Sequence, residues 1–462
     1  MHVVPGTPTS SVARSGYQNF GSFHCDSVED LVVQSAETYR APALPFESPL
    51  PHGLSELPLG VPCRSLFKID FNKWTFVNHG AFGGVCVPAF REAECWREHC
   101  ETQPLKFLDR EVLPHMVRVI REMAGFVHCR PQDLAFLSNA TTALNVVIRS
   151  AGLRPGDTIY MLSIGYGSVK KMAQAAVEGL NVVYGDVQFP ISGPQDILDL
   201  VASTLPANTR LAVFDAVTSN TALLLPMEGL IEICKSRGVP VMVDAAHALG
   251  QIPVDLASLS PDYWVTNCHK WFAGPRGSAL MWVAPHRRAA LKPLVVSHGS
   301  GSGFTSDFIW DGCRDYAPYL AVSSSLRMWT ALGPDRVLRH MHDTLRQAVA
   351  LLTRRFGSST LAPLSMCAAM ALVRLPGRLA GLLGGAEGRA GSEEAKYVQD
   401  LLHEVHHVEC PVKAVQGQLY VRVSCHIYNC LQDYETLADA VDSILHELER
   451  QQLVQLHPVV LV

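Results

Sequence analysis

The sequence predicts an α/β protein: a large domain built on a mostly parallel β-sheet covered by helices, followed by a smaller C-terminal α+β domain. Between residues 133 and 291, short apolar runs alternate with segments of helix length. Strands that are apolar throughout and are each followed by a helix are typical of a parallel sheet covered on both faces. The chain also has 462 residues, which is more than one hydrophobic core usually serves, so we expect two domains.

Composition excludes several classes of protein. Apolar residues make up 48% of the chain and charged residues 18%, which excludes a disordered chain. The formal net charge is -5, so no basic excess would attract nucleic acid or a membrane, and no apolar run is long enough to span a bilayer. The thirteen cysteines are scattered without a C-x-x-C pair. This indicates reduced thiols and a cytoplasmic protein, with a mitochondrial address left open.

The elements follow in order along the chain. Residues 1–65 are rich in Pro, Ser and Gly, and we expect a largely unpacked, disordered extension with one short helix near 28–36. The strands of the large domain are predicted at 134–138, 158–163, 181–187, 210–217, 239–245, 263–267 and 279–283. Its helices are predicted at 141–150, 169–178, 195–203, 227–236 and 285–291.

The pattern changes after residue 333. A long helix at 334–356 is expected there, and then an apolar strand, a helix at 392–406, a strand at 419–424 and a closing helix at 434–451. We therefore divide the chain into the extension 1–65, a large domain 66–332 and a small domain 333–462. In open parallel sheets ligands bind beyond the carboxyl ends of the strands, so the residues just after each strand are the candidates for function.

Two charged residues follow successive strands of the large domain. Asp244 ends the apolar strand 239–245, where a carboxylate needs a partner. Lys270 follows strand 263–267 by a short turn, and a half-buried lysine loses its proton more readily and can attack a carbonyl. An acid for a ring nitrogen and a lysine that forms a Schiff base are the two protein groups that pyridoxal phosphate requires. His247 and His269 lie close to this pair in the sequence.

These motifs, D-x-x-H at 244–247 and N-x-H-K at 267–270, resemble those of the class V aminotransferases. These are pyridoxal-phosphate enzymes of fold type I. The chain is most similar to the isopenicillin N epimerase-like branch, with cysteine desulfurases and selenocysteine lyases as cousins. The resemblance runs from about residue 76 to about 437. It implies that Lys270, Asp244 and His247 are the catalytic residues.

The resemblance also implies where the cofactor binds. Ala140 and Thr141 open a helix after a strand, a place where free N–H groups suit a phosphate; an ordinary helix cap is the alternative. Asn267 and His269 would add hydrogen bonds to the phosphate. Tyr166 falls where the family stacks a ring on the pyridine face, and a core tyrosine is the alternative. Asn220 falls where the cousins place a side chain beside the ring hydroxyl.

The remaining matches concern the substrate and the assembly. Arg422 resembles the arginine that grips the substrate carboxylate, a task suited to a bidentate guanidinium. Asn78 and His79 resemble the N-terminal loop that lines the substrate pocket. The segment 310–315 resembles a loop that reaches the cofactor phosphate of a neighbouring subunit, and Cys313 stands there in place of a threonine. A homodimer with shared sites that acts on an amino acid is therefore expected.

The reaction itself stays open at this point. A Schiff base at Lys270 and an α-carbanion lead to epimerisation, to elimination with C–S cleavage, or to transamination, and we rank epimerase-like and C–S lyase-like chemistry above an aminotransferase. A second hypothesis is a zinc hydrolase, because His403, Glu404 and His407 satisfy H-E-x-x-H and would share a helical face. A third is a non-catalytic relative that serves as an interaction module.

Overall fold

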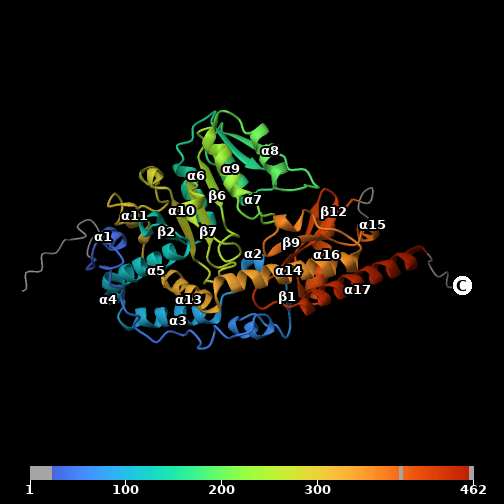
Figure 1. The fold of residues 1–462 in the computed structure, drawn as a ribbon, viewed down its shortest axis with the longest axis horizontal. Helices are drawn as coiled ribbons and strands as arrows, with labels where there is room; N and C mark the ends of the chain where they lie inside the picture. Colours follow the sequence, from blue (N-terminus) through green and yellow to red (C-terminus); the bar gives the residue numbers. More distant parts are fainter. Residues whose placement is uncertain (1–22, 384–388, 457–462) are drawn as a thin grey trace, which may run out of the picture.

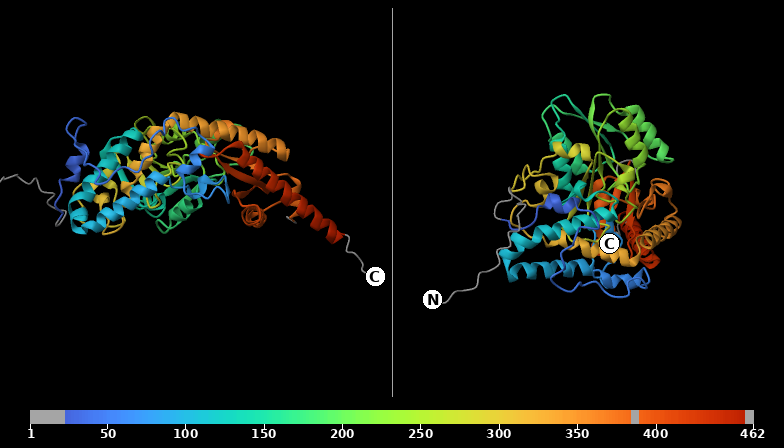
Figure 2. Two further views of the ribbon diagram at one scale, coloured as in Figure 1. Left: turned by 90° about the horizontal axis from the view of Figure 1, so that it is seen from below. Right: turned by 60° about the vertical axis from the view of Figure 1, so that its left-hand side comes forward.

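The structure of the protein is a computed structural model that describes residues 23–383 and 389–456. The parts of the expected extension and small domain at 1–22, 384–388 and 457–462 lie outside the described residues. The large sheet and its helices form one end of an elongated molecule, and the last strands and helices form the other (Figure 1). Seen from below, the closing helix runs outward at the far end from the large sheet (Figure 2).

The large domain is built on a seven-stranded sheet with the order β2-β8-β7-β6-β5-β3-β4. The strands are β2 (Leu134–Leu137), β3 (Thr158–Leu162), β4 (Asn181–Gly185), β5 (Thr209–Asp215), β6 (Val241–Asp244), β7 (Tyr263–Asn267) and β8 (Ala279–Val283). All neighbours from β7 to β4 pair in parallel, and only β8 runs against its two neighbours. The predicted mostly parallel sheet is thus confirmed, and its strand ends meet at one edge.

Helices cover both faces of this sheet. On one face α6 (Ala140–Ser150) and α7 (Gly167–Gln174) pack on alternate strand residues such as Val213 and Val265. The other face buries the intervening residues, including Phe214 and Trp264. They lie in one apolar cluster with side chains of α3 (Val87–Thr102), α5 (Val112–Phe126), α8 (Pro194–Thr204), α9 (Met227–Ser236), α12 (Ala317–Leu320) and α13 (Val322–Leu332). This alternation is what a twice-covered sheet requires.

The small domain has its own core. Its antiparallel sheet has the order β11-β12-β9, formed by β11 (Val412–Val415), β12 (Gln418–Ser424) and β9 (Met370–Arg374). The helices α14 (Pro334–Phe356), α16 (Ser392–Glu404) and α17 (Leu431–Leu456) contribute to the same apolar cluster, together with the short α15 (Arg378–Leu382). A two-stranded parallel pair, β1 (Thr75–Phe76) with β10 (Val408–Glu409), joins the N-terminal part of the chain to this domain.

The N-terminal segment differs from the expectation. From residue 23 onward it is packed and not an unpacked extension, since Val28, Val32, Leu54 and Cys63 are all buried in the core of the large domain. The short helix expected near 28–36 is present as α1 (Val28–Val33), and it lies against α5 and α11 (Phe304–Ile309). The Pro-rich composition therefore reflects an irregular path over the surface and not a lack of contacts.

Other elements also differ from the sequence prediction. The segment expected as a helix at 285–291 is a 3-10 helix, Pro285–Ala290. The helix expected at 392–406 ends at Glu404, and the short α2 (His79–Phe82), α4 (Pro104–Lys106) and α10 (Leu256–Leu259) were not foreseen. None of the helices within the described residues has the length and apolar character that crossing a membrane demands.

Candidate active site

Three charged side chains meet at the carboxyl edge of the large sheet. Asp244 is the last residue of β6, and Asp215 is the last residue of β5, directly beside it in register. Lys270 follows β7 by a short turn. Its pKa depends on both carboxylates, which oppose the effect of burial. The parallel topology thus gathers two acids and one amine from three neighbouring strands.

The amine of Lys270 lies in a hydrogen-bonded row of three side chains. Its Nζ is 2.9 Å from Nε2 of His247, and the indole Nε1 of Trp271 donates to Nδ1 of the same imidazole at 3.2 Å. An indole N–H is only a donor, so Nδ1 must accept and a neutral His247 carries its proton on Nε2. That proton points at Nζ, and the bond forms when Lys270 is an uncharged amine with a free lone pair.

The pKa values of Lys270 and His247 agree with a hydrogen bond between an uncharged amine and a neutral imidazole. Burial lowers the pKa of Lys270 to about 8. The positive charge of Arg422 also lowers this pKa, whereas the carboxylates of Asp244 and Asp215 raise it. Burial also lowers the pKa of His247 well below its usual value, which keeps the imidazole neutral. About a tenth of Lys270 is therefore uncharged at pH 7, and an uncharged amine is the form that attacks a carbonyl.

The two carboxyl groups affect each other. Burial raises the pKa of Asp244, while the backbone N–H of Ala246 at 3.0 Å and the charge of Lys270 lower it. Burial and the neighbouring Asp244 together raise the pKa of Asp215 well above its usual range, and a hydrogen bond from the Tyr166 backbone opposes them. Two adjacent buried carboxylates do not both ionise easily, so the pair holds a proton that a nearby cationic ring nitrogen would displace.

The start of helix α6 is fixed by two amide side chains. Asn139 is the N-cap and accepts from the Thr142 N–H through Oδ1 at 2.8 Å. Asn267, at the end of β7, accepts from the Ala140 N–H at 2.9 Å. Because Asn267 already binds Ala140, these two residues hold each other, and Thr141 is left exposed at the open end of the helix. A helix N-terminus of this kind favours an anion.

Two further side chains leave room for a planar cofactor. Tyr166, the N-cap of α7, has 42% of its surface exposed although it stands next to buried strand ends. Within the described residues, Nδ1 of His269 is buried without a hydrogen-bond partner. A buried polar atom without a partner is uncommon and costs free energy. Both observations fit a bound group with an apolar ring face and hydrogen-bonding oxygens.

His79 holds the backbone of Lys270 through a hydrogen bond to its carbonyl. The ring is fully buried, its Nε2–H donates to the carbonyl of Lys270 at 3.1 Å, and its Nδ1 accepts from the hydroxyl of Tyr428 at 2.8 Å. His426 stacks on His79 with ring centroids 3.7 Å apart and donates to the carbonyl of Trp271 at 3.0 Å. His79 was expected to line the substrate pocket, but both of its nitrogens are engaged by the protein.

Arg422 and Asn78 do come together. Arg422 is only 3% exposed on β12. Its Nη2 donates to Oδ1 of Asn78 at 3.0 Å, and its Nη1 donates to the Ser219 carbonyl at 2.6 Å. Among the described residues, its Nε has no hydrogen-bond partner and no carboxylate lies within ion-pair distance of it. A buried cation with only neutral partners has the capacity to bind an anion.

Two predicted residues lie apart from this group. Asn220 is exposed in the turn after β5, whereas the position that faces Asp244 is taken by Asp215. Cys313 is exposed in the loop after α11, and within the described chain it has no hydrogen bond to any of the site residues. Asn220 adjoins Ser219, whose carbonyl binds Arg422, and within the described chain neither residue is hydrogen-bonded to Lys270.

The zinc hypothesis fails on geometry. Helix α16 ends at Glu404, and His407 lies beyond it with a positive φ of 53°, so His403 and His407 do not share a helical face. His403 instead pairs with Glu409 at 2.8 Å. No group of three or more potential metal ligands occurs in the part of the chain that the structure describes.

Sequence reasoning missed three residues of the site: Asp215, Trp271 and His426. Asp215 had a signal, since it follows an apolar strand as Asp244 does, in the similar segments A-V-F-D and V-M-V-D. The predicted strand ran on to residue 217 through Ala216 and Val217, so the acid was counted as interior. Trp271 contacts His247, and His426 contacts Trp271 and His79. Contacts between elements so far apart in the sequence leave no local sequence pattern.

The chain is similar to known proteins over most of its length. Residues 111–357 match the family described as Aminotransferase class-V. The chain is 30% identical over 407 residues to putative L-cysteine desulfhydrase 1 of Oryza sativa subsp. japonica, covering 80% of this chain and 83% of the relative. It is 28% identical over 391 residues to isopenicillin N epimerase of Streptomyces clavuligerus, covering 80% and 95%.

Solved structures share the fold. A complex between the cystine C–S lyase C-DES and its product cysteine persulfide matches with a TM-score of 0.67 and 19% sequence identity, covering 80% of this chain and 97% of that one. At this identity the match concerns the fold alone, and it agrees with the large parallel sheet and the small antiparallel sheet described above.

Proposed function

Because the chain belongs to the aminotransferase class-V family, whose members use pyridoxal phosphate, we propose that it is a pyridoxal-phosphate-dependent C–S lyase. It acts on L-cysteine or an S-substituted L-cysteine. The reaction consumes water and releases the thiol or sulfide, ammonia and pyruvate. The observation that carries this proposal is the amine of Lys270, 2.9 Å from His247 beside two carboxyl groups. Relatives named L-cysteine desulfhydrase support the choice of substrate.

The residues of the site fit the cofactor. Lys270 would attach it covalently, and Asp244 would pair with its ring nitrogen. Thr141, at the start of α6, and His269, with its unpartnered Nδ1, would bind the phosphate. Tyr166 would cover one ring face. Asp215, in register with Asp244, would lie beside the ring, where the sequence predicts Asn220. Ala140 and Asn267 would act by fixing the helix that receives the phosphate.

When bound, pyridoxal phosphate withdraws electrons from the α-carbon of an amino acid and so makes its α-proton acidic. Lys270 is placed to take that proton, because its amine is kept partly uncharged and its direction is fixed by His247. Arg422 would hold the substrate carboxylate and so orient the α-carbon. Burial of these groups strengthens each of the interactions by excluding water.

Release of sulfur, and not its transfer to Cys367, is favoured. Burial raises the pKa of the Cys367 thiol to about 12, and its Sγ lies 3.9 Å from the carbonyl of Pro363 as a weak donor. A sulfur acceptor must be a thiolate, and a thiol with so high a pKa is almost fully protonated near neutral pH. Cys367 therefore makes a poor persulfide carrier.

Epimerisation of an amino acid is the second candidate, because the chain is also similar to an isopenicillin N epimerase. It uses the same removal of the α-proton, but the α-carbon is then reprotonated and no C–S bond breaks. A test that measures D-isomer and thiol in one incubation separates the two. Transamination ranks below both, and it would appear as a keto acid formed with retention of the side chain.

The assembly and surroundings are also proposals. We expect a homodimer with shared sites. The exposed apolar side chains of Phe82, near the site, and of Val295 and Val296 support this, since a partner subunit would cover them. All thirteen cysteines are free, which supports a reducing compartment such as the cytoplasm. The division between a large domain 66–332 and a small domain 333–462 is supported by the apolar cluster that residues after 333 form almost entirely among themselves, and limited proteolysis tests it.

The test of the proposed function has two parts. Borohydride reduction of the cofactor-loaded protein, followed by peptide mapping, must find a pyridoxyl group on Lys270, and Lys270→Ala must abolish it. Incubation with L-cysteine and S-methyl-L-cysteine must release sulfide or methanethiol together with pyruvate. Label on another residue would overturn the assignment of Lys270. A labelled protein that yields D-isomer without thiol would replace the lyase with the epimerase.

A further inference from the structure

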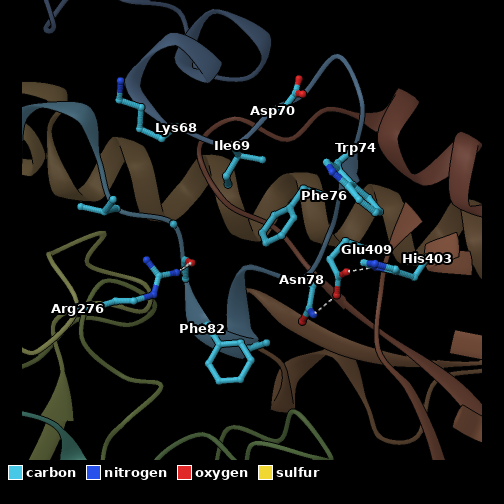
Figure 3. Close-up of a pocket in the computed structure, with 14 residues that line it drawn as sticks. Lys68, Ile69, Asp70, Trp74, Phe76, Asn78, Phe82, Arg276, His403 and Glu409 are labelled. Carbon is cyan, nitrogen blue, oxygen red and sulfur yellow. Dashed lines mark hydrogen bonds and ion pairs between the residues drawn. The ribbon is translucent and has the colours of Figure 1, made fainter. Parts of the chain in front are cut away.

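A continuous row of hydrogen bonds runs from the surface of the small domain to Arg422. Nδ1 of His403, whose side chain is 49% exposed, lies 2.8 Å from Oε2 of Glu409. Oε1 of Glu409 accepts from Nδ2 of Asn78 at 2.8 Å, and Oδ1 of Asn78 accepts from Nη2 of Arg422 at 3.0 Å. Figure 3 shows the two outer contacts, from His403 through Glu409 to Asn78. The four residues come from α16, β10, the loop before α2, and β12.

The direction of each bond follows from the chemistry of the groups. A guanidinium has only donors, so the amide oxygen of Asn78 must face Arg422. The amide nitrogen must then face an acceptor, and an ionised carboxylate at Glu409 is acceptor-only. Without Glu409 the amide nitrogen loses this acceptor, and the Asn78 side chain is then anchored by Arg422 alone. Glu409 therefore fixes the position of the amide group that Arg422 binds.

Arg422 depends on this arrangement because it has little else to hold it. Its two other anchoring features are the Ser219 carbonyl at 2.6 Å and the burial of its side chain. The row also links the Glu409 carboxylate to this buried cation through a neutral amide, so the guanidinium is oriented without a direct ion pair. A direct ion pair would occupy the positions that a substrate carboxylate needs.

We propose that Glu409 is a positioning residue that acts through Asn78 to hold Arg422 in the orientation that receives the substrate α-carboxylate. The inference rests on the proposed function, in which Arg422 binds that carboxylate. In this proposal His403, the first histidine of the H-E-x-x-H segment, orients Glu409 through its hydrogen bond on the solvent side. None of these residues except Arg422 touches the substrate in this arrangement.

The surroundings of Glu409 make it suitable for substitution. Glu409 and His403 line an open cavity of about 610 Å³ together with Trp74, Phe76 and Asn78, whose lining side chains Figure 3 shows. Shortening Glu409 enlarges a space that already exists and does not empty a closed part of the core. The Glu409→Ala protein is therefore expected to fold, and Glu409→Gln keeps both shape and one acceptor for Asn78.

The experiment measures the selectivity of the holoenzyme for a carboxylate. S-methyl-L-cysteine and 2-(methylthio)ethylamine differ only in the carboxylate, and their binding is measured by the change in the visible absorbance of the cofactor. Glu409→Ala is expected to raise the Kd of S-methyl-L-cysteine about tenfold and its KM similarly, with kcat within twofold. The Kd of the amine should stay unchanged. Glu409→Gln should recover most of the loss.

Two controls separate the possible failures. Glu404→Ala removes an exposed acid at the end of the same helix as His403 and should behave as wild type. Arg422→Ala should erase the preference for S-methyl-L-cysteine over the amine. If Arg422→Ala leaves that preference intact, the carboxylate site of the proposed function is wrong. If Arg422→Ala erases it while Glu409→Ala keeps the wild-type preference, only the positioning role of Glu409 is overturned.

Discussion

At the scale of single residues, the indole of Trp271 influences the charge of Lys270 through the imidazole of His247. Trp271 donates to Nδ1 of His247, and this bond places the imidazole proton on the side of the lysine amine. The protonated amine cannot accept that proton, so the indole favours the uncharged lysine. The neighbour in sequence thus acts on the lysine through a loop from a different strand.

Replacing Trp271 with Phe should raise the pKa of Lys270. Without the indole donor, Nδ1 can carry the imidazole proton, and Nε2 then accepts from a charged lysine. The midpoint for capture of pyridoxal phosphate by the apoprotein should move upward from about 8 toward the usual value of 10.5. The pH dependence of the capture rate, monitored by absorbance, measures it.

Asp215→Asn serves as the opposite control for this experiment. The ionised form of Asp215 raises the pKa of Lys270, so a variant without that form should move the same midpoint downward and not upward. If Trp271→Phe and Asp215→Asn shifted the midpoint in the same direction, the tautomer assigned to His247 would be incorrect.

At the scale of elements, helix α11 begins against a side chain from the N-terminal segment. Oε1 of Glu29, on α1, accepts from the Ser306 N–H at 2.7 Å, in the first turn of α11. The α11 N-cap is Gly303, which has no side chain to cap with. A carboxylate there satisfies a free N–H and complements the helix dipole. The segment at 23–65 therefore helps to fix the start of α11.

Glu29→Ala should lower the free energy of unfolding by about 1 kcal/mol, the usual effect of losing a helix cap. Urea denaturation of the full chain measures the change. Asp30→Ala, an exposed acid on the same helix, is the matched control and should cost less than half as much. An equal effect of the two variants would show that charge on α1, and not the cap, matters.

The turn after α2 packs directly on the lysine backbone. Gly83 has φ of +67°, and a Cβ on it would lie 2.1 Å from the His269 carbonyl oxygen and 2.8 Å from Cα of Lys270. Gly83→Ala should therefore destabilise the protein by at least about 2 kcal/mol and prevent correct placement of the lysine.

The thermal midpoint and the yield of borohydride-trapped cofactor both measure the effect of Gly83→Ala. Gly167→Ala, at the first residue of α7 with nothing within 4 Å of the added Cβ, is the control. If Gly83→Ala had the same thermal midpoint and the same yield of trapped cofactor as Gly167→Ala, the turn would not be as tightly packed as described.

The elements of the sheet were predictable because each has a local cause. An apolar strand such as β7 and the polar residues after it are both visible in the sequence, so the fold, Asp244 and Lys270 were found together. The ends were less certain, and one strand extended too far hid Asp215. The packed path of residues 23–65 has no periodic pattern, because its contacts are with distant helices. The contact of Trp271 with His247 depends on how two loops meet, which no local pattern contains.

At the scale of the whole molecule, histidines join the large and small domains around the lysine. His79 and His426 stack and donate to the carbonyls of Lys270 and Trp271. Burial lowers the pKa of His426 to about 4 and that of His79 well below its usual value. Both rings are therefore neutral in the folded protein at neutral pH, and charging them opposes folding.

The folded protein should lose stability as the pH falls from about 6.5 to about 4. In this window the unfolded chain binds protons on these histidines and the folded chain does not, so the balance shifts toward unfolding. For His426 alone the loss is about 3 kcal/mol over the whole window and about 2 kcal/mol between pH 7 and pH 5. Urea denaturation of the full chain at pH 7 and pH 5 measures it. His426→Gln, which keeps a donor for the Trp271 carbonyl, should reduce the slope, and an unchanged slope would contradict a neutral His426.

The pairing of β1 with β10 has a consequence for biosynthesis. When Lys270 has been added to the growing chain, strand β10 at residues 408–409, Arg422 and His426 have not yet been translated. Until those codons are read, the nascent polypeptide has neither the second strand that secures the loop before α2 nor the imidazole that braces the lysine. The supports of Lys270 are therefore completed only after the segment 408–426 has been translated.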